Sequence, residues 1–436
     1  MMNDICIDID YSQIYKHGQN IGGDVFLLDR DKGSNIITAT LSDGLGSGVK
    51  ANVLASITSH MANKMSFSPM DLGHSAAIIM DTLPVDKDKG ISYSTFTIAR
   101  IVFASDKSFI DVELVEYDNP ESLRFRGSEP IEWEKTKTRL HRKAAVKDEV
   151  IYASSFNMEL GDRLIFFSDG IAQAGVSLGE IPVNRPSRPQ YYGGASKESV
   201  SSNAVAAAVA AAAAEAEKPK EWGVDNVREF VAKLLEERPD IDSRALSRAI
   251  VSEAYKHDNY KSNDDITCAV VAIRRPKRTL IVTGAPRNKS SDKRLGEIVA
   301  NYEGNTIVCG GTTAKIIARE LGKDVKADRS PSGNLPPAAI IEGVTLTTEG
   351  MLTLTEVAER LDNKTLLKNM PEDAAKRIIS ILRESDQIEF IVGTKINDET
   401  DDPTTAAKIG VRFPVVDKIS TALEHKYFKE VEIMYY

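Results

Sequence analysis

The sequence changes character at a short basic string, Arg274, Arg275, Pro276, Lys277 and Arg278. Before it, most apolar segments are short, rich in β-branched or aromatic residues, and bounded by Gly, Asp or Asn, which is typical of strands. After it, strand-like and helix-like segments alternate, as in TLIVTGAP followed by DKRLGEIVANYE. The first pattern predicts an α+β domain over residues 1–275, and the second a smaller three-layer α/β domain over residues 279–436. A chain of 436 residues is long enough for two cores.

Helical segments in the first region come in blocks and do not alternate with the strands. Two follow one another as VKANVLASITSHMANKM and PMDLGHSAAIIMDTL, and two more as VDNVREFVAKLLEE and SRALSRAIVSEAYK, all with apolar residues at helical spacing. Between residues 176 and 222 lies a proline-containing loop and then an alanine tract, which has high helix propensity but little to bury. We interpret this stretch as a low-complexity insert, and a partly disordered flap is the alternative.

Composition excludes several classes of protein. A net charge of −9 and a pI near 5.4 argue against a surface built for nucleic acid or for an anionic membrane. No apolar run reaches the length of about 18 residues that a membrane span requires. The three cysteines are few, odd in number and widely separated, which favours buried thiols in a reducing compartment. With no signal-peptide pattern at the start, we expect a cytoplasmic protein.

Four aspartates share one setting, in which a strand-like segment ends or begins at a turn. They are Asp24 in GGD, Asp43 in SDGLGSG, Asp169 in SDG and Asp264 in NDD. Hard divalent cations prefer oxygen ligands, and carboxylates from the ends of neighbouring strands can converge on one point. Each motif taken alone is more often an ordinary turn, and spacing alone does not separate the two interpretations.

The order of these motifs carries more information than any one of them. The series GGD…SDGLGSGVKA…FFSDG…NDDITCAVV resembles the PPM, or protein phosphatase 2C-like, superfamily, and looks closest to the bacterial branch that includes stage II sporulation protein E. The resemblance spans residues 5–273. It implies a β-sandwich flanked by helices, with two divalent ions, Mn²⁺ or Mg²⁺, bound at one end.

The resemblance also implies roles for individual residues. Asp43 would bridge the two metals and Gly44 would offer its carbonyl oxygen. Asp24 would bind the second metal, and Asp169 and Asp264 the first, so that Asp43, Asp169 and Asp264 form the expected catalytic set. Asp265 is given a lesser role.

Two features of the eukaryotic members are missing, as they are in the bacterial branch. No arginine precedes Gly22 to bind phosphate, and Leu45 and Gly46 stand where a histidine would protonate the leaving group. The leaving-group acid is therefore not identified. For Lys50, His60 and His74 we favour ordinary surface or structural roles.

The function that follows is metal-dependent hydrolysis of phosphoserine or phosphothreonine on a protein, in bacterial signalling. The branch implies a small anti-sigma-factor antagonist as one substrate, and a homodimer is compatible with the sequence. One alternative is a pseudophosphatase that binds a phosphoprotein without turnover. The other is a hydrolase of a small phosphorylated metabolite.

The second domain offers one candidate site. Gly311, Thr312 and Thr313 stand between a strand and a helix, where free backbone amides and two hydroxyls favour an anion. The alternative is that a threonine caps the helix and the glycines make the turn. We predict that this domain senses a ligand or docks a partner and thereby regulates the first.

Overall fold

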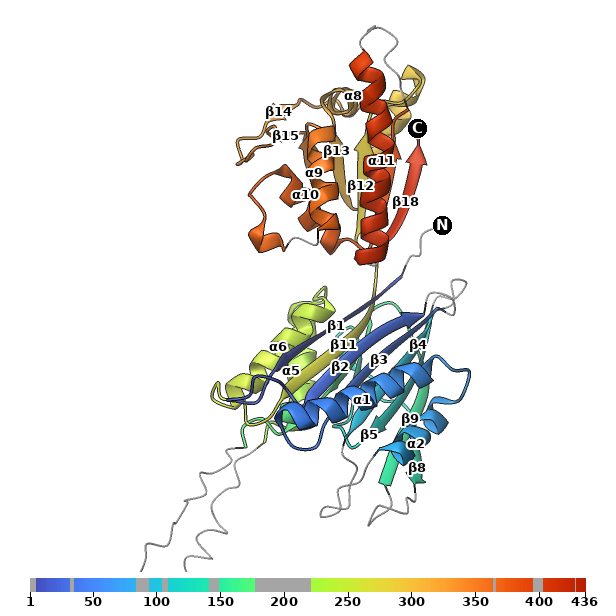
Figure 1. The fold of residues 1–436 in the computed structure, drawn as a ribbon, viewed down its shortest axis with the longest axis vertical. Coiled ribbons are helices and arrows are strands. Elements are labelled where there is room, and N and C mark those ends of the chain that lie inside the picture. Colours follow the sequence, from blue (N-terminus) through green and yellow to red (C-terminus); the bar gives the residue numbers. More distant parts are fainter. Residues whose placement is uncertain are drawn as a thin grey trace, which may run out of the picture. The chain divides into compact units, whose positions relative to one another are not determined.

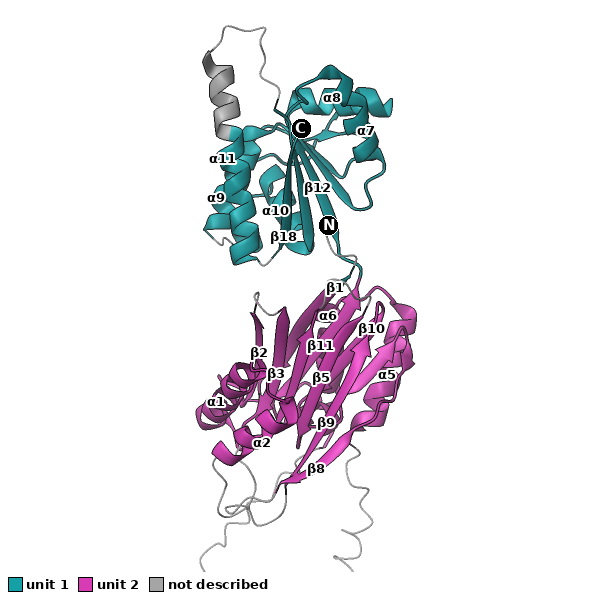
Figure 2. Ribbon diagram, turned by 90° about the vertical axis from the view of Figure 1, so that its right-hand side faces the viewer, with its two compact units in different colours: residues 1–6, 275–436 teal, residues 7–274 magenta. Residues whose placement is uncertain are grey.

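The computed structural model describes most of the chain in two compact units. The described residues are 5–31, 35–83, 94–103, 109–140, 149–176, 221–363, 366–394, 403–427 and 429–436, with backbone alone for 403–411. One unit is Ile7–Arg274, and the other combines residues 1–6 with 275–436 (Figure 2). The insert predicted over 176–222 lies almost entirely outside the described residues. None of the described helices combines the length and the apolar character needed to cross a membrane.

The unit Ile7–Arg274 contains two sheets (Figure 1). The larger has six antiparallel strands in the order β2 (Asp24–Asp31), β3 (Ile36–Asp43), β4 (Phe96–Val102), β5 (Ile110–Tyr117), β9 (Glu149–Met158) and β8 (Thr136–Leu140). The smaller has five strands in the order β1 (Cys6–Ile14), β11 (Ile266–Arg274), β10 (Asp162–Phe167), β6 (Leu123–Arg126) and β7 (Glu129–Pro130). In the smaller sheet β10 runs antiparallel to both β11 and β6.

Helices cover one face of each sheet. Helices α1 (Gly48–Ser66) and α2 (Leu72–Thr82) pack on the larger sheet, where Ile79 meets Phe96 and Ile98 in one apolar core. Helices α5 (Gly223–Glu237) and α6 (Ser243–His257) pack on the smaller sheet, where Ile250 meets Phe167. A single turn, α3 (Asp169–Ala172), follows β10.

The other faces of the two sheets meet each other. Side chains alternate along a strand, so the neighbours of helix-facing Phe167, such as Phe166, point the opposite way. The rings of Phe26 on β2 and Phe166 on β10 lie 6.4 Å apart between centroids, which brings the inner faces together. The result is a β-sandwich between two helical layers, and the predicted α+β class is confirmed.

Four strands of this unit have no clear signal in the sequence. β6 and β7 are only four and two residues long, and β8 is TKTRL, almost entirely exposed. β9, with the sequence EVIYASSFNM, mixes apolar and polar residues without a regular alternation, and most of its side chains are half-buried or exposed. Pairing with an existing sheet, and not local preference, makes these segments extended.

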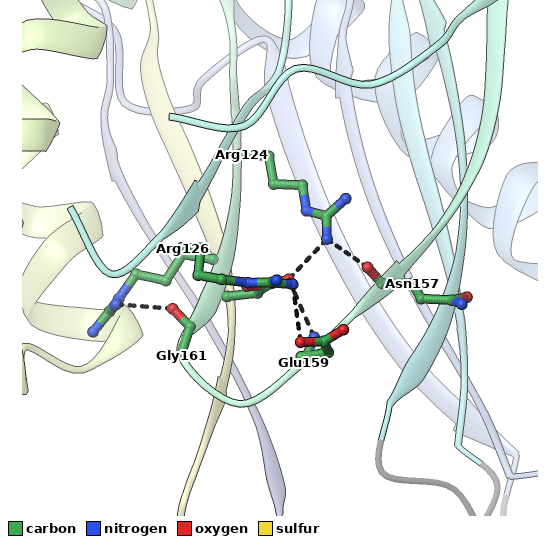
Figure 3. A network of polar contacts seen from close by, with 7 residues as sticks. Arg124, Arg126, Asn157, Glu159 and Gly161 are labelled. Carbon is green, nitrogen blue, oxygen red and sulfur yellow. Dashed lines mark hydrogen bonds and ion pairs between the residues drawn. The ribbon is translucent and has the colours of Figure 1, made fainter. Parts of the chain in front are cut away.

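A buried carboxylate fixes the junction between β6 and β10. Asp162, the first residue of β10, is fully buried and accepts hydrogen bonds from Arg126 Nε at 2.6 Å and Arg124 Nη2 at 2.8 Å. The network continues to Asn157 and Glu159 (Figure 3). Burial alone would raise the pKa of Asp162, but the bonds from Arg126 and Arg124 outweigh it and hold the pKa below its usual value.

We predict that Asp162→Asn destabilises this unit by about 3 kcal/mol at pH 7, because it leaves a buried guanidinium without its anion. The lowered pKa means that the native interaction is fully present above the unfolded value of 3.8 and is lost as pH falls through the folded pKa. The difference between variant and wild type should therefore shrink below about pH 4. Urea unfolding followed by tryptophan fluorescence measures it, since both tryptophans, Trp133 and Trp222, lie in this unit.

Glu159→Gln is the matched control, because the Glu159 carboxylate is more than half exposed and lies 3.3 Å from Arg126. It should change the free energy of unfolding by less than about 0.5 kcal/mol. Equal effects of the two substitutions would contradict the assignment of the buried clamp to Asp162.

The second unit has a mainly parallel sheet. Its parallel strands are, in spatial order, β16 (Leu346–Thr348), β13 (Asn305–Cys309), β12 (Arg278–Thr283), β17 (Gln387–Val392) and β18 (Glu430–Tyr435). An antiparallel edge is added beside β16 by β15 (Ala339–Ile340) and β14 (Lys326–Ala327). The chain builds outward from β12 in one direction and then restarts at β17 in the other. The point between β12 and β17 is therefore the place where the winding reverses.

Helices cover both faces of this sheet. One face carries α7 (Asp292–Ala300), preceded by the 3₁₀ turn Lys289–Ser291, and α8 (Gly311–Leu321); the other carries α9 (Met351–Asp362), α10 (Ala374–Glu384) and α11 (Pro403–Lys426), with a 3₁₀ turn at Leu367–Asn369. Helix α11 is not among the elements the sequence predicts, because Pro414 interrupts its pattern. Its second half nevertheless buries Val416, Ile419 and Leu423 in the core.

Candidate metal centre

The four predicted aspartates lie at the same end of the sandwich. Asp24 is the first residue of β2 and pairs across the sheet with Asp43, the last residue of β3. Asp169 directly follows the strand end of β10, and Asp264 stands two residues before β11. Because β10 and β11 are antiparallel, the end of one and the start of the other also share an edge. Antiparallel pairing in both sheets thus gathers residues 240 positions apart.

Hydroxyl groups join the two sheets at this end. Thr267 on β11 donates its Oγ1–H to Asp24 Oδ2 at 2.6 Å. Ser168 donates to the carbonyl of Asp265 at 3.2 Å, and its own Oγ accepts from Thr267 N at 3.1 Å. Sequence reasoning did not identify Ser168 or Thr267, although each stands beside a predicted ligand. These bonds fix the Asp24 carboxylate against the opposite sheet.

Asp265 has a structural role that the sequence did not reveal. It is 4% exposed, its Oδ2 accepts from Gly23 N at 2.6 Å, and its Oδ1 accepts from Lys16 N at 2.9 Å. Both carboxylate oxygens are therefore used to hold the loop that leads into Asp24. Its neighbour Asp264 points elsewhere, with Oδ1 3.5 Å from Lys16 Nζ.

Two glycines permit close approach of backbones around the cluster. A Cβ on Gly44 would lie 2.0 Å from the carbonyl oxygen of Ala51 in α1, and one on Gly170 would lie 2.2 Å from the carbonyl oxygen of Asp265. Neither position can carry a side chain without displacing backbone. The Asp-Gly pairs therefore serve the packing of this end, whatever else they do.

The carboxyl groups repel one another in a partly dehydrated place. Burial, together with the charges of Asp24, Asp169 and Asp264, raises the pKa of Asp43 to about 10. Burial raises the pKa of Asp24 to about 8, against hydrogen bonds from Thr267 and Ser168 that lower it. Asp43 and Asp24 are close enough to hydrogen-bond each other, which requires a proton on one of them. Burial and Asp264 raise the pKa of Asp169 to about 6.

The carboxylate oxygens of this cluster are ligands of the kind that divalent cations prefer, but the described side chains do not converge on one point. None of the influences on the pKa of Asp43 or Asp24 comes from a basic residue, so a cation would relieve their repulsion. Among the described residues, no three His, Cys, Asp or Glu side chains stand close enough to hold an ion as they are placed. Coordination therefore requires carboxylates to reorient. The Gly44 carbonyl makes none of the backbone hydrogen bonds found at this end.

The two histidines lie away from the cluster. His60 is twelve residues into α1, about 18 Å along the helix from its start, and its Nδ1 lies 2.7 Å from the Ser56 carbonyl. His74 lines a cavity of about 690 Å³ between α2 and the strands β5, β8 and β9. Both places agree with the structural roles expected for them.

Comparison with known proteins gives likenesses of structure alone. No family model and no curated protein matches the sequence. The phosphatase domain of SpoIIE from Bacillus subtilis is 15% identical, with 63% of this chain and 95% of that chain covered and a TM-score of 0.38. A SpoIIE structure with a fragment of its regulatory domain is 17% identical (63% and 65% covered, TM-score 0.41), and RsbX in complex with magnesium is 16% identical (63% and 98%, TM-score 0.36).

The two SpoIIE structures contain a phosphatase domain, named as PP2C in one of them, which is the superfamily that the order of the motifs resembles. Identities and TM-scores this low assign no activity. What the acidic end can do has to be judged from its own residues.

The raised pKa values generate a prediction about the metal-free protein. We predict that, in EDTA at pH 8, Asp43→Asn unfolds about 2–4 °C above wild type, equivalent to about 1 kcal/mol in a domain of this size. An amide can still donate to Asp24 but adds no charge. Because the folded pKa of Asp43 lies above its unfolded value of 3.8, wild-type stability falls as pH rises from 3.8 toward about 10. The difference should vanish near pH 4.

Tryptophan fluorescence during heating measures this effect. Asp225→Asn on α5 serves as control, since the Asp225 side chain is 89% exposed and should respond little at either pH. If Asp43→Asn destabilises the protein in EDTA at pH 8, the carboxylates do not repel one another as described.

Proposed function

We propose that the unit Ile7–Arg274 is a metal-dependent phosphatase that removes phosphate from phosphoserine or phosphothreonine on a protein. The observation that carries the proposal is the gathering of Asp24, Asp43, Asp169 and Asp264 at one end of the sandwich. Asp24 is buried and Asp43 half-buried, and no basic residue is among the main influences on their pKa. Retaining such a pair lowers stability, and a bound cation is the simplest compensation.

In this proposal Asp24, Asp43, Asp169 and Asp264 would together hold two cations of the Mn²⁺ or Mg²⁺ type. When bound, such ions lower the pKa of water and neutralise charge on a transferring phosphoryl group. The chain's own part is to hold the carboxylates. Thr267 fixes Asp24, and Asp265 fixes the backbone at Gly23 that leads into Asp24.

The leaving-group acid is still open among the described residues. Lys16 Nζ, beside Asp264, is the nearest cationic group that the ion pairs place at the cluster. Its backbone is held by Asp265, so its position relative to Asp264 is defined. A lysine here can bind phosphate oxygens as a point charge.

A binding module without turnover is the second candidate, and one observation favours it. The carboxylates as placed do not bring three donors together around one point within the described part of the chain. A protein that recognises a phosphorylated partner through this end would need the fold but not two ions. The proposed substrate is a phosphoprotein, of which an anti-sigma-factor antagonist is one example.

We predict that the protein releases phosphate from a phosphoserine peptide and from p-nitrophenyl phosphate only with Mn²⁺ or Mg²⁺, and that Asp169→Asn lowers kcat/KM by at least about 100-fold. Loss of one carboxylate charge removes both a ligand and part of the charge compensation at the centre. Initial rates with increasing Mn²⁺, for both proteins, give the comparison.

Asp225→Asn is the matched control, because the Asp225 side chain is 89% exposed on α5 and lies outside the four motifs. It should keep turnover within a few-fold of wild type. Metal-independent turnover would refute the mechanism. Phosphopeptide binding without any turnover would identify the binding module.

A further inference from the structure

The second unit contains an arginine at the point where the winding of its parallel sheet reverses. Arg412 lies on α11, and its Nη1 donates to the carbonyl of Gly393, which directly follows the end of β17, at 2.7 Å. Ligands of open α/β sheets bind in the crevice at this kind of reversal. The position of Arg412 is therefore the place where a ligand of this fold is expected.

Most N–H groups of the Arg412 guanidinium make no hydrogen bond to the described residues. Within the described part of the chain, the Gly393 carbonyl is its only hydrogen-bond partner, and its buried Nε has none. No ion pair links it to a carboxylate of the described residues. Burial lowers its pKa, and no neighbouring charge opposes that shift. A partly buried guanidinium with four of its five N–H groups unused is an unsatisfied anion-binding group.

Glycines make room for this side chain. A Cβ on Gly284, at the end of β12, would lie 2.3 Å from Arg412 Nη1, and Gly284 has φ of +86°. A Cβ on Gly393 would lie 2.2 Å from the Ala285 carbonyl oxygen. The strand ends at the reversal are therefore bare backbone, which lets a ligand approach the guanidinium and the neighbouring amides together.

Unsatisfied amides lie on the adjacent strand. β13 pairs with β12 through Thr283 and Cys309, the last residues of the two strands, so Gly284 and Gly310 each follow directly after a pair of neighbouring strand ends. Helix α8 begins at Gly311, and its cap position is Gly310, which offers no side chain to accept from the first amides. The predicted capping by Thr312 or Thr313 is not seen at that position.

Helix α9, which follows the next strand, β16, already has a carboxylate bonded at its start. Glu349 Oε2 accepts from Leu352 N at 3.3 Å in the first turn of α9, which places a carboxylate at that helix start. The start of α8 has no such group: Gly311 and Thr312 are exposed, and nothing lies within 4 Å of a Cβ on Gly311.

From Arg412, the bare strand ends and the open start of α8, we infer that this unit binds the phosphate group of a small phosphorylated molecule at the reversal between β12 and β17. Arg412 would contact the phosphate oxygens from one side, and the amides of Gly311 and Thr312 from the other. The amides would be reinforced by the positive end of α8. The inference is independent of the phosphatase proposal, since every residue in it belongs to the second unit.

Isothermal titration calorimetry of the full chain with inorganic phosphate and with pyrophosphate tests the inference. Titrations are made in EDTA, so that no metal-dependent phosphate binding occurs at the acidic end, and at constant ionic strength. We expect saturable binding of at least one probe to wild type, and at least about a tenfold weaker affinity for Arg412→Gln, the loss expected for hydrogen bonds to a charged group.

Lys418→Gln is the matched control. Lys418 lies on the same helix, carries the same charge and stands 3.6 Å from Asp362, away from the strand ends. Its affinity should equal that of wild type. No saturable binding to wild type, or equal losses in Arg412→Gln and Lys418→Gln, would overturn the inference.

A second variant keeps the test valid if Arg412→Gln unfolds. Gly311→Pro removes one amide donor at the first position of α8, where proline is well tolerated, and the open space around Gly311 accommodates the ring. It should leave the melting temperature near that of wild type and weaken phosphate or pyrophosphate binding several-fold. Unchanged affinity in a folded Gly311→Pro protein would exclude the start of α8 from the site.

Discussion

The mutual repulsion of buried carboxylates is the interaction on which the first unit depends. Asp24 and Asp43 face each other at the end of a two-stranded pair, and burial pushes both pKa values far above those of a free carboxyl group. A core that excluded water without any chemical need would not retain such a pair, because apolar residues of the same size would be more stable there. The other residues of the acidic end offset part of the free energy lost by burying these carboxyl groups.

This offset comes from hydrogen bonds and close backbone packing. Thr267 and Ser168 stabilise the ionised form of Asp24, and Asp265 uses both oxygens to fix the loop in front of it. Gly44 and Gly170 let α1 and the 264–265 turn press against the site. Far from this end, Asp162 shows the opposite electrostatic solution, in which two arginines keep a buried carboxylate charged. The contrast separates a structural acid from the functional candidates.

The second unit poses the same physical problem with the sign reversed. Arg412 is a partly buried cation whose described partner is a single carbonyl, and it stands where a doubly wound sheet leaves its strand ends open. One unit therefore offers uncompensated negative charge, and the other uncompensated positive charge. Each is a place where an ion of opposite charge would raise stability by binding only to the folded state.

Local pattern alone determined much of this protein. Strand and helix periodicity predicted most elements of both units, and the order of the Asp-containing motifs predicted which residues would lie at the acidic end. Asp24 and Asp43 could be named because their motifs, in this order, resemble those of the PPM superfamily, whereas each turn signal alone would not have marked them. Weak strands such as β8, and the helix α11 with Pro414 inside it, could not, because their conformation comes from pairing and packing with distant segments.

Only the tertiary structure decided what the named residues do. It separated Asp264 from its neighbour Asp265, which is bonded to Gly23 and Lys16 more than 240 positions away in the chain. It also placed Arg412 against Gly284, a contact that no local pattern encodes. Sequence fixes the chemical type of each side chain and its local conformation. Burial, and the charges that surround a group, depend on which distant segments the fold brings beside it.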